Sequence, residues 1–145
     1  MSDALPQYVV RRVTWQDSRD ALSSVRRAVF IVEQRVPEEL EWDDDDSDAV
    51  HALALVAGTP IGTGRLLRDG RIGRMAVMPA WRRRGVGSAI LQSLLEAARA
   101  LGCIHICLHA QTHAIAVYAR HGFVAVGDEF IEAGIPHREM MLRTP

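Results

Sequence analysis

The chain has 145 residues, 48% of them hydrophobic and 24% charged, which is enough apolar material for one domain to bury a core without disulfide bonds. Seventeen basic against eighteen acidic residues leave a formal net charge of −1, so no global positive charge favours nucleic acid or a membrane surface as a partner. Two cysteines, an N-terminus unlike a signal peptide and the lack of a long apolar run predict a single cytoplasmic domain over residues 1–145.

The first half of the chain predicts one helix among several strands. Residues 8–14 are β-rich, and Asp17 is the expected N-cap of a helix that ends before Pro37. The apolar positions of that helix recur at helical spacing: Leu22, Val25, Val29 and Val32. Three strand-like runs follow an acidic segment, at residues 50–57, 61–68 and 71–78, separated by glycine-containing turns. They predict an antiparallel meander.

The second half begins with the clearest helical pattern, an apolar stripe over residues 85–101 that ends at Gly102. Alternation predicts a strand over residues 104–109, followed by a helix over 112–121 and terminal strands over 123–130 and 138–142. This order of elements is typical of an α/β domain with one mixed sheet.

The junction between the third meander strand and the long helix has the character of an anion site. Gly85 and Gly87 let the backbone approach a ligand closely, and the first amides of a helix attract negative charge. Arg82, Arg83 and Arg84 add positive charge. The segment lacks the Gly-Lys-Ser/Thr of a Walker A loop and the third glycine of a dinucleotide fingerprint, so we expect another kind of phosphate.

Two ordered motifs resemble the GNAT superfamily of N-acetyltransferases. One is Arg82-x-x-Gly85-x-Gly87 after a Val-x-Pro strand end, and the other is the A-x-x-x-Y-x-x-x-G-F segment over residues 114–123. Segments at residues 29–37, 51–54 and 134–137 further resemble the ElaA-like branch. The resemblance implies an acetyl-CoA-dependent N-acetyltransferase with a mixed, mostly antiparallel sheet of six to seven strands, flanked by about four helices.

The resemblance also implies where acetyl-CoA binds. Backbone groups of Met75, Ala76 and Val77 would pair with the pantetheine arm, which needs a splayed sheet. The pyrophosphate would lie on a loop of seven residues, with backbone amides doing most of the binding and arginine side chains helping: Arg82, Arg83, Arg84, Gly85, Val86, Gly87 and Ser88. Gln111 falls where the family often has an asparagine near the cofactor.

For catalysis, the resemblance makes Tyr118 the acid that protonates the departing thiolate, which suits a phenol with an ordinary pKa near 10. The strand over residues 71–75 lacks the family's glutamate, so the general base must come from elsewhere. Candidates are Glu33, whose apolar surroundings suggest burial and a raised pKa, and His109. We expect direct attack by a primary amine in a ternary complex rather than an acyl-Cys107 intermediate, because the sequence gives Cys107 no activating partner beyond nearby histidines.

The acceptor amine is expected to contact Glu33, Gln34, His51 and His137. Cys103, His105, Cys107 and His109 alternate on the expected strand, but residues spaced ~6.6 Å apart cannot converge on one ion, so we expect no metal. The acceptor could be a polyamine, an amino sugar, an amino acid, or a protein terminus or lysine.

Eight acids lie between residues 38 and 48, without the spacing of a calcium loop. They predict either a solvated loop or a surface that attracts a cationic amine. A non-catalytic acyl-CoA-binding sensor is the main rival function, since it needs neither Tyr118 nor a base, and a small nucleic-acid-binding domain ranks below it. Trp15, Trp42 and Trp81 are candidate exposed aromatics, and we lean towards a homodimer.

Overall fold

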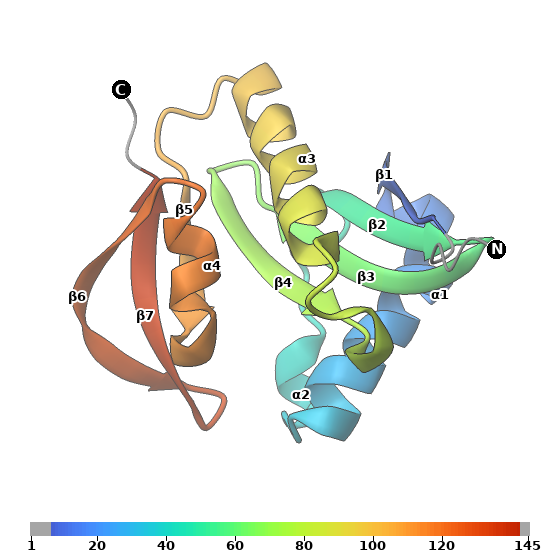
Figure 1. Cartoon of the computed structure of the whole chain (residues 1–145), viewed down its shortest axis with the longest axis horizontal. Coiled ribbons are helices and arrows are strands. Elements are labelled where there is room, and N and C mark those ends of the chain that lie inside the picture. Colours follow the sequence, from blue (N-terminus) through green and yellow to red (C-terminus); the bar gives the residue numbers. More distant parts are fainter. Residues whose placement is uncertain (1–6, 143–145) are drawn as a thin grey trace, which may run out of the picture.

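The computed structural model of the chain describes residues 7–142. Its strands form one seven-stranded sheet in the order β1-β2-β3-β4-β5-β7-β6, seen in Figure 1 as a broad N-terminal part and a smaller part built from β5, β7 and β6. Every neighbouring pair is antiparallel except β4 with β5. The strands are β1 (Val9–Val13), β2 (Val50–Val56), β3 (Thr59–Leu66), β4 (Arg71–Val77), β5 (Cys107–Gln111), β6 (Phe123–Glu132) and β7 (Ile135–Leu142).

The helices are α1 (Trp15–Arg26), α2 (Glu38–Glu41), α3 (Val86–Ala100) and α4 (Ile115–Ala119). A π-helical segment, η1 (Arg27–Glu33), continues α1, and single 3-10 turns, η2 (Pro79–Trp81) and η3 (Thr112–Ala114), precede α3 and α4. The expected α/β class, mixed sheet and number of helices are confirmed. No helix in the part of the chain that the structure describes is long and apolar enough to cross a membrane.

The N-cap of α1 was predicted at Asp17, which is wrong. Thr14 is the N-cap: its backbone is extended, and its hydroxyl accepts the N–H of Asp17 at 3.1 Å. Asp17 instead lies in the first turn, where its charge suits the helix dipole.

Helix α3 and helix α1 cover opposite faces of the sheet. On β3, Gly62 and Gly64 face α3, and a methyl group at Gly64 would lie only 2.7 Å from Ile90 Cγ2. These glycines therefore let α3 approach the sheet closely. Thr63 and Arg65, which alternate with them, face the opposite side.

Strands β4 and β5 are joined only at one end. Their register contains Arg71 with Cys107 and Ile72 with Leu108, and no later pair. Along the remainder of β4 the register with β3 is irregular, and Arg74 adopts a positive φ of 50°, as at a β-bulge. The two strands diverge beyond Ile72, so the splayed sheet expected from the sequence is confirmed.

Boundaries in the second half differ from the prediction. The strand expected over residues 104–109 begins at Cys107, because pairing starts only where the Cys107 N–H reaches the carbonyl of Gly70 at 3.1 Å. Ile104 is 78% exposed, and Cys103 and His105 lie before the strand rather than on it. The helix expected over residues 112–121 is shorter, and β6 and β7 are longer than predicted.

Candidate functional site

The N-terminus of α3 lies beside the end of β4 at which the sheet is open. After η2, the turn through Arg83 (φ 63°) and Gly85 (φ 82°) leads into α3 at Val86. The first N–H in this region that reaches a helical carbonyl is that of Ala89, bonded to Gly85 at 3.0 Å. The amides before it are the orphan donors of a helix N-terminus, which together with the helix dipole attract an anion.

Gly87 has no structural need to be glycine. A methyl group built on it would find Val77 Cγ2 as its nearest neighbour at 3.8 Å, an ordinary contact, and its φ is not positive. Its lack of a side chain instead leaves the first turn of α3 open to close approach by a ligand.

Two of the three arginines beside this turn have partners within the protein. Arg82 donates from Nε to the carbonyl of Val77 at 2.9 Å and forms a two-pronged ion pair with Glu33, at 2.6 and 2.5 Å. Arg84 stacks over Trp81, with its guanidinium carbon 5.1 Å from the ring centroid. The Arg82 side chain therefore ties η1 to the end of β4, with its guanidinium paired to Glu33.

Glu33 was expected to be buried, with a raised pKa, and this is wrong. Its side chain is 39% exposed at the end of η1. The hydrogen bonds from Arg82 lower the pKa of Glu33, outweighing the opposing effect of its partial burial. Glu33 is consequently a weaker base than an ordinary glutamate.

Tyr118 lies on α4 and packs edge-to-face against Phe123, with ring centroids 6.1 Å apart. Burial raises the pKa of the Tyr118 phenol to about 12, so the hydroxyl stays protonated at neutral pH. Near it, His121 Nε2 lies 3.1 Å from the hydroxyl of Ser88. This contact links the end of α4 to the first turn of α3.

Gln34 and Gln111 form a reciprocal pair of side-chain amides. Gln34 Nε2 donates to Gln111 Oε1 at 3.3 Å, and Gln111 Nε2 donates to Gln34 Oε1 at 2.9 Å. Gln34 follows η1, whereas Gln111 is the last residue of β5. The pair thus connects the helical segment that packs on β4 with the strand that diverges from it.

His109 is the first residue of β5 beyond the last pair with β4, on the face opposite α3. Its Nε2 lies 2.9 Å from Arg71 Nη1 and 3.8 Å from a carboxylate oxygen of Glu139, and its Nδ1 lies 3.1 Å from Glu132 Oε1. Sequence reasoning missed Arg71, Glu132 and Glu139, because only the register of β4, β5, β7 and β6 brings them together.

His137 is a neighbour of this group on β7. Its ring stacks on Phe130, with centroids 5.9 Å apart, and Phe130 also meets His109 edge-to-face at 5.0 Å. The Nδ1–H of His137 donates to the carbonyl of Ile135 at 2.7 Å. The structure therefore brings together His109 and His137, two of the residues proposed from the sequence.

His51 lies elsewhere and is 1% exposed. Its Nε2–H donates to the carbonyl of Asp46 at 2.9 Å, its ring lies against Trp15, and burial lowers its pKa. The expectation that His51 contacts the acceptor is therefore at odds with its position inside the fold.

Two of the eight acids in the acidic segment are neither solvated nor free to attract a cation. Glu41 and Asp46 are 3% and 2% exposed and both bind the buried guanidinium of Arg26, at 2.7 and 2.8 Å. Arg65 bridges Asp46 and Asp43, at 3.0 and 2.8 Å. Both interpretations are wrong for Glu41 and Asp46, whereas Asp43 is paired although its side chain is 32% exposed. Local pattern cannot predict these contacts, which join residues up to 33 apart in the chain.

The tryptophans of this region are partners of the same arginine. The rings of Trp15 and Trp42 lie 5.4 and 5.2 Å from the guanidinium carbon of Arg26. Both are half-buried rather than exposed, so neither supports the homodimer expected from the sequence.

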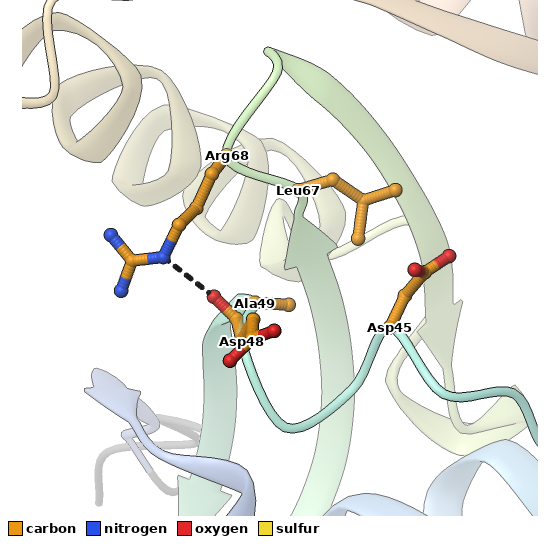
Figure 2. Close-up of a pocket in the computed structure, with 5 residues that line it drawn as sticks. All are labelled: Asp45, Asp48, Ala49, Leu67 and Arg68. Carbon is orange, nitrogen blue, oxygen red and sulfur yellow. Dashed lines mark hydrogen bonds between the residues drawn. The ribbon is translucent and has the colours of Figure 1, made fainter.

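A pocket of about 340 Å³ lies at the opposite end of β4 from the α3 N-terminus. Figure 2 shows its lining residues, with the bond from Arg68 Nε to the carbonyl of Asp48, 2.9 Å long, at one side. None of the residues proposed for the site lines it: its lining consists of Asp45, Asp48, Ala49, Leu67 and Arg68.

Comparison with known proteins agrees with this geometry. Residues 15–144 match the acetyltransferase (GNAT) domain. The N-acetyltransferase YjcF of Bacillus subtilis is 38% identical over 121 residues, covering 81% of this chain and 86% of YjcF. ElaA of Escherichia coli is 31% identical, covering 86% of this chain and 93% of ElaA.

Solved structures give the same result. The crystal structure of an acyl-CoA N-acyltransferase from Pseudomonas aeruginosa superposes with a TM-score of 0.80 at 33% identity, covering 94% of this chain and 99% of that one. The crystal structure of Escherichia coli ElaA superposes with a TM-score of 0.84 at 28% identity, over 94% and 100% of the two chains. The chain belongs to the GNAT acetyltransferase family and is an N-acetyltransferase of its ElaA-like branch.

Proposed function

We propose that the chain transfers the acetyl group of acetyl-CoA to a primary amine by direct attack in a ternary complex. The observation that carries this proposal is the divergence of β4 from β5 beyond Ile72. The free amides of the α3 N-terminus lie beside the end of β4 at which the two strands are apart. An extended thioester arm fits along a strand edge that lacks a partner, and a pyrophosphate fits the helix N-terminus.

The residues of β4 suit the pantetheine arm. Beyond Ile72 the strand has no partner on its β5 side, so backbone groups of Met75, Ala76 and Val77 are candidates to pair with the amides of the arm. The Met78 N–H bonds the Ile61 carbonyl, so in the register with β3 the backbone of Ala76 faces Thr63, whereas Met75 and Val77 face the open side. The carbonyl of Val77 already accepts the Arg82 side chain, which leaves Met75 and the Val77 N–H as the main partners. We retain Gln111 as a further polar contact at the end of β5.

The pyrophosphate would lie on the turn that precedes α3. The backbone amides of Arg83, Arg84, Gly85, Val86 and Gly87 provide most of the donors, with the hydroxyl of Ser88 behind them. In this proposal the Arg82 side chain contributes by holding the turn against Glu33 rather than by touching a phosphate.

Bound acetyl-CoA supplies an activated thioester carbonyl. As the C–N bond to the acceptor forms and the C–S bond breaks, Tyr118 donates its hydroxyl proton to the departing sulfur. A pKa of about 12 keeps that proton in place at neutral pH, and the phenolate regains a proton from solvent once product leaves.

His109 is the better candidate for the general base. It lies where β4 and β5 part, and a neutral imidazole can accept a proton at neutral pH. The ion pair with Arg82 lowers the pKa of Glu33, which makes Glu33 a weak base. We assign Glu33, with Gln34 and His137, to the surroundings of the acceptor.

We further propose that the enzyme acts in the cytoplasm and forms a homodimer, as expected from the sequence. Light scattering over a concentration series tests the assembly, and a constant monomer mass would contradict it.

The function is tested with purified protein, acetyl-CoA and a panel of spermidine, glucosamine, leucine and a peptide with a free amino terminus. Loss of thioester absorbance is the preferred readout, because Cys103 and Cys107 are free and would react with thiol reagents. Turnover with one class of amine supports the enzyme and identifies its acceptor. Tight binding of acetyl-CoA without turnover on any amine would favour the sensor, and absence of binding would refute the site.

A further inference from the structure

His109 is held at both ring nitrogens by side chains from neighbouring strands. Arg71 on β4 can only donate, so the Nε2 that it meets at 2.9 Å must be an acceptor. The ionised carboxylate of Glu132 on β6 can only accept, so the Nδ1 that lies 3.1 Å away must carry the proton. These two contacts together select one neutral tautomer of His109, with its lone pair on Nε2.

Glu132 is itself held in place by the hairpin that carries it. It is the last residue of β6 and pairs with Ile135 across a two-residue turn, in which Ala133 and Gly134 have φ of 52° and 77°. The positive φ at both positions is typical of a type I′ turn. A tight turn of this kind fixes where the Glu132 side chain leaves the sheet.

The second oxygen of Glu132 faces another imidazole. Its Oε2 lies 3.7 Å from His137 Nε2, and the Phe130 ring packs against both imidazoles, at 5.0 Å from His109 and 5.9 Å from His137. The half-exposed carboxylate thus lies between two rings that share one aromatic neighbour, and its hydrogen bond is to His109.

We propose that Glu132 is a positioning residue for acyl transfer, one that holds His109 with its proton on Nδ1 so that Nε2 can accept the proton of the acceptor amine. This inference rests on the function proposed above. Arg71 occupies Nε2 until the amine takes its place. As the new C–N bond forms, the amine proton passes to Nε2 and the carboxylate of Glu132 stabilises the resulting imidazolium without being protonated itself.

The charges around His109 determine the direction of the expected pH effect. From β4 it faces Arg71, from β6 Glu132, and from β7 Glu139 and His137. Replacing Glu132 by glutamine removes the nearest negative charge and leaves Arg71 in place. We therefore expect the acid limb of kcat/KM in Glu132→Gln to lie at lower pH than in wild type.

The test compares Glu132→Gln with the matched variant Glu129→Gln. Glu129 is an exposed glutamate on the same strand, with no ion pair in the described part of the chain. We expect Glu132→Gln to lower kcat by about 10- to 100-fold with the KM for acetyl-CoA unchanged, and Glu129→Gln to behave like wild type. Nitrogen NMR of the imidazoles, which needs no substrate, should report an Nδ1–H tautomer for His109 in wild type.

Making Glu132→Gln in a His109→Ala variant distinguishes a positioning role of Glu132, which acts through His109, from a direct role in catalysis. Glu132→Gln should cause no further loss of kcat there, because the two side chains act as one unit. An equal loss in both backgrounds, or an Nε2–H tautomer of His109 in wild type, would overturn the positioning role while leaving acyl transfer intact. Absence of transfer by wild type with every amine would instead refute the proposed function, and this inference with it.

Discussion

The buried guanidinium of Arg26 provides the sharpest test of the fold's energetics. It is 1% exposed and donates to Glu41 Oε2 at 2.7 Å, to Asp46 at 2.8 and 3.2 Å, and to the Glu41 carbonyl at 3.1 Å. Arg26→Met would keep the apolar stem but remove the charge, leaving two buried carboxylates with Arg65 and Arg74 as their arginine partners among the described residues.

Removing one partner of a buried ion pair typically costs about 3–5 kcal/mol. At roughly 2–4 °C per kcal/mol for a domain of this size, the melting temperature should fall by about 6 to 20 °C. Thermal unfolding followed by circular dichroism measures this directly, with urea unfolding for the free energy.

The adjacent residue is a matched control. Arg27 pairs with Glu38 at 2.6 Å, but the two side chains are 49% and 54% exposed, and an exposed pair contributes at most about 1 kcal/mol. Arg27→Met should therefore change the melting temperature by only a few degrees. Equal losses of melting temperature in the two variants would refute the argument that burial makes the Arg26 network more stabilising than an exposed ion pair.

Three further predictions concern the site and pH. Tyr118→Phe should lower kcat by about 100-fold with acetyl-CoA affinity unchanged in calorimetry, and unchanged turnover would exclude the acid role. Glu33→Gln should keep the acid limb of the kcat/KM profile, and loss of that limb would return the base role to Glu33. Because burial lowers the pKa of His51 from 6.5, its contribution to stability is complete above that value and is lost as pH falls below it. His51→Gln should flatten this decline in urea unfolding at pH 5 to 7, and an unchanged slope would show that other groups cause it.

Hydrophobic periodicity predicted most of the fold, because each helix or strand that buries one face shows that periodicity in its own residues. The stripe of α3 and the meander of β2, β3 and β4 lie within a residue or two of the expected bounds, since each buries one regular face. The alternation over residues 104–109 misled because Ile104 is exposed and the strand begins only where β4 offers a partner. Local pattern carries no information about when a partner strand starts.

The site was predictable in part for the same reason. The turn before α3 and the tyrosine on α4 are local motifs, so the sequence identified them. The ion pair of Glu33 with Arg82 joins residues 49 apart in the chain, and it reverses the direction predicted for the Glu33 pKa. The carboxylates around His109 come from strands that meet only through sheet order, which no local pattern encodes.

The central claim, that the α3 N-terminus and the open edge of β4 bind acetyl-CoA, is tested most directly by calorimetric titration of wild type and Gly87→Ala. The fold has room for the added methyl group, and replacing a helical glycine by alanine should stabilise the domain by up to about 1 kcal/mol. We predict one acetyl-CoA site per chain in wild type, weakened at least tenfold, or about 1.4 kcal/mol, in a variant that melts no lower. No binding to wild type, or equal binding to both proteins, would contradict the account.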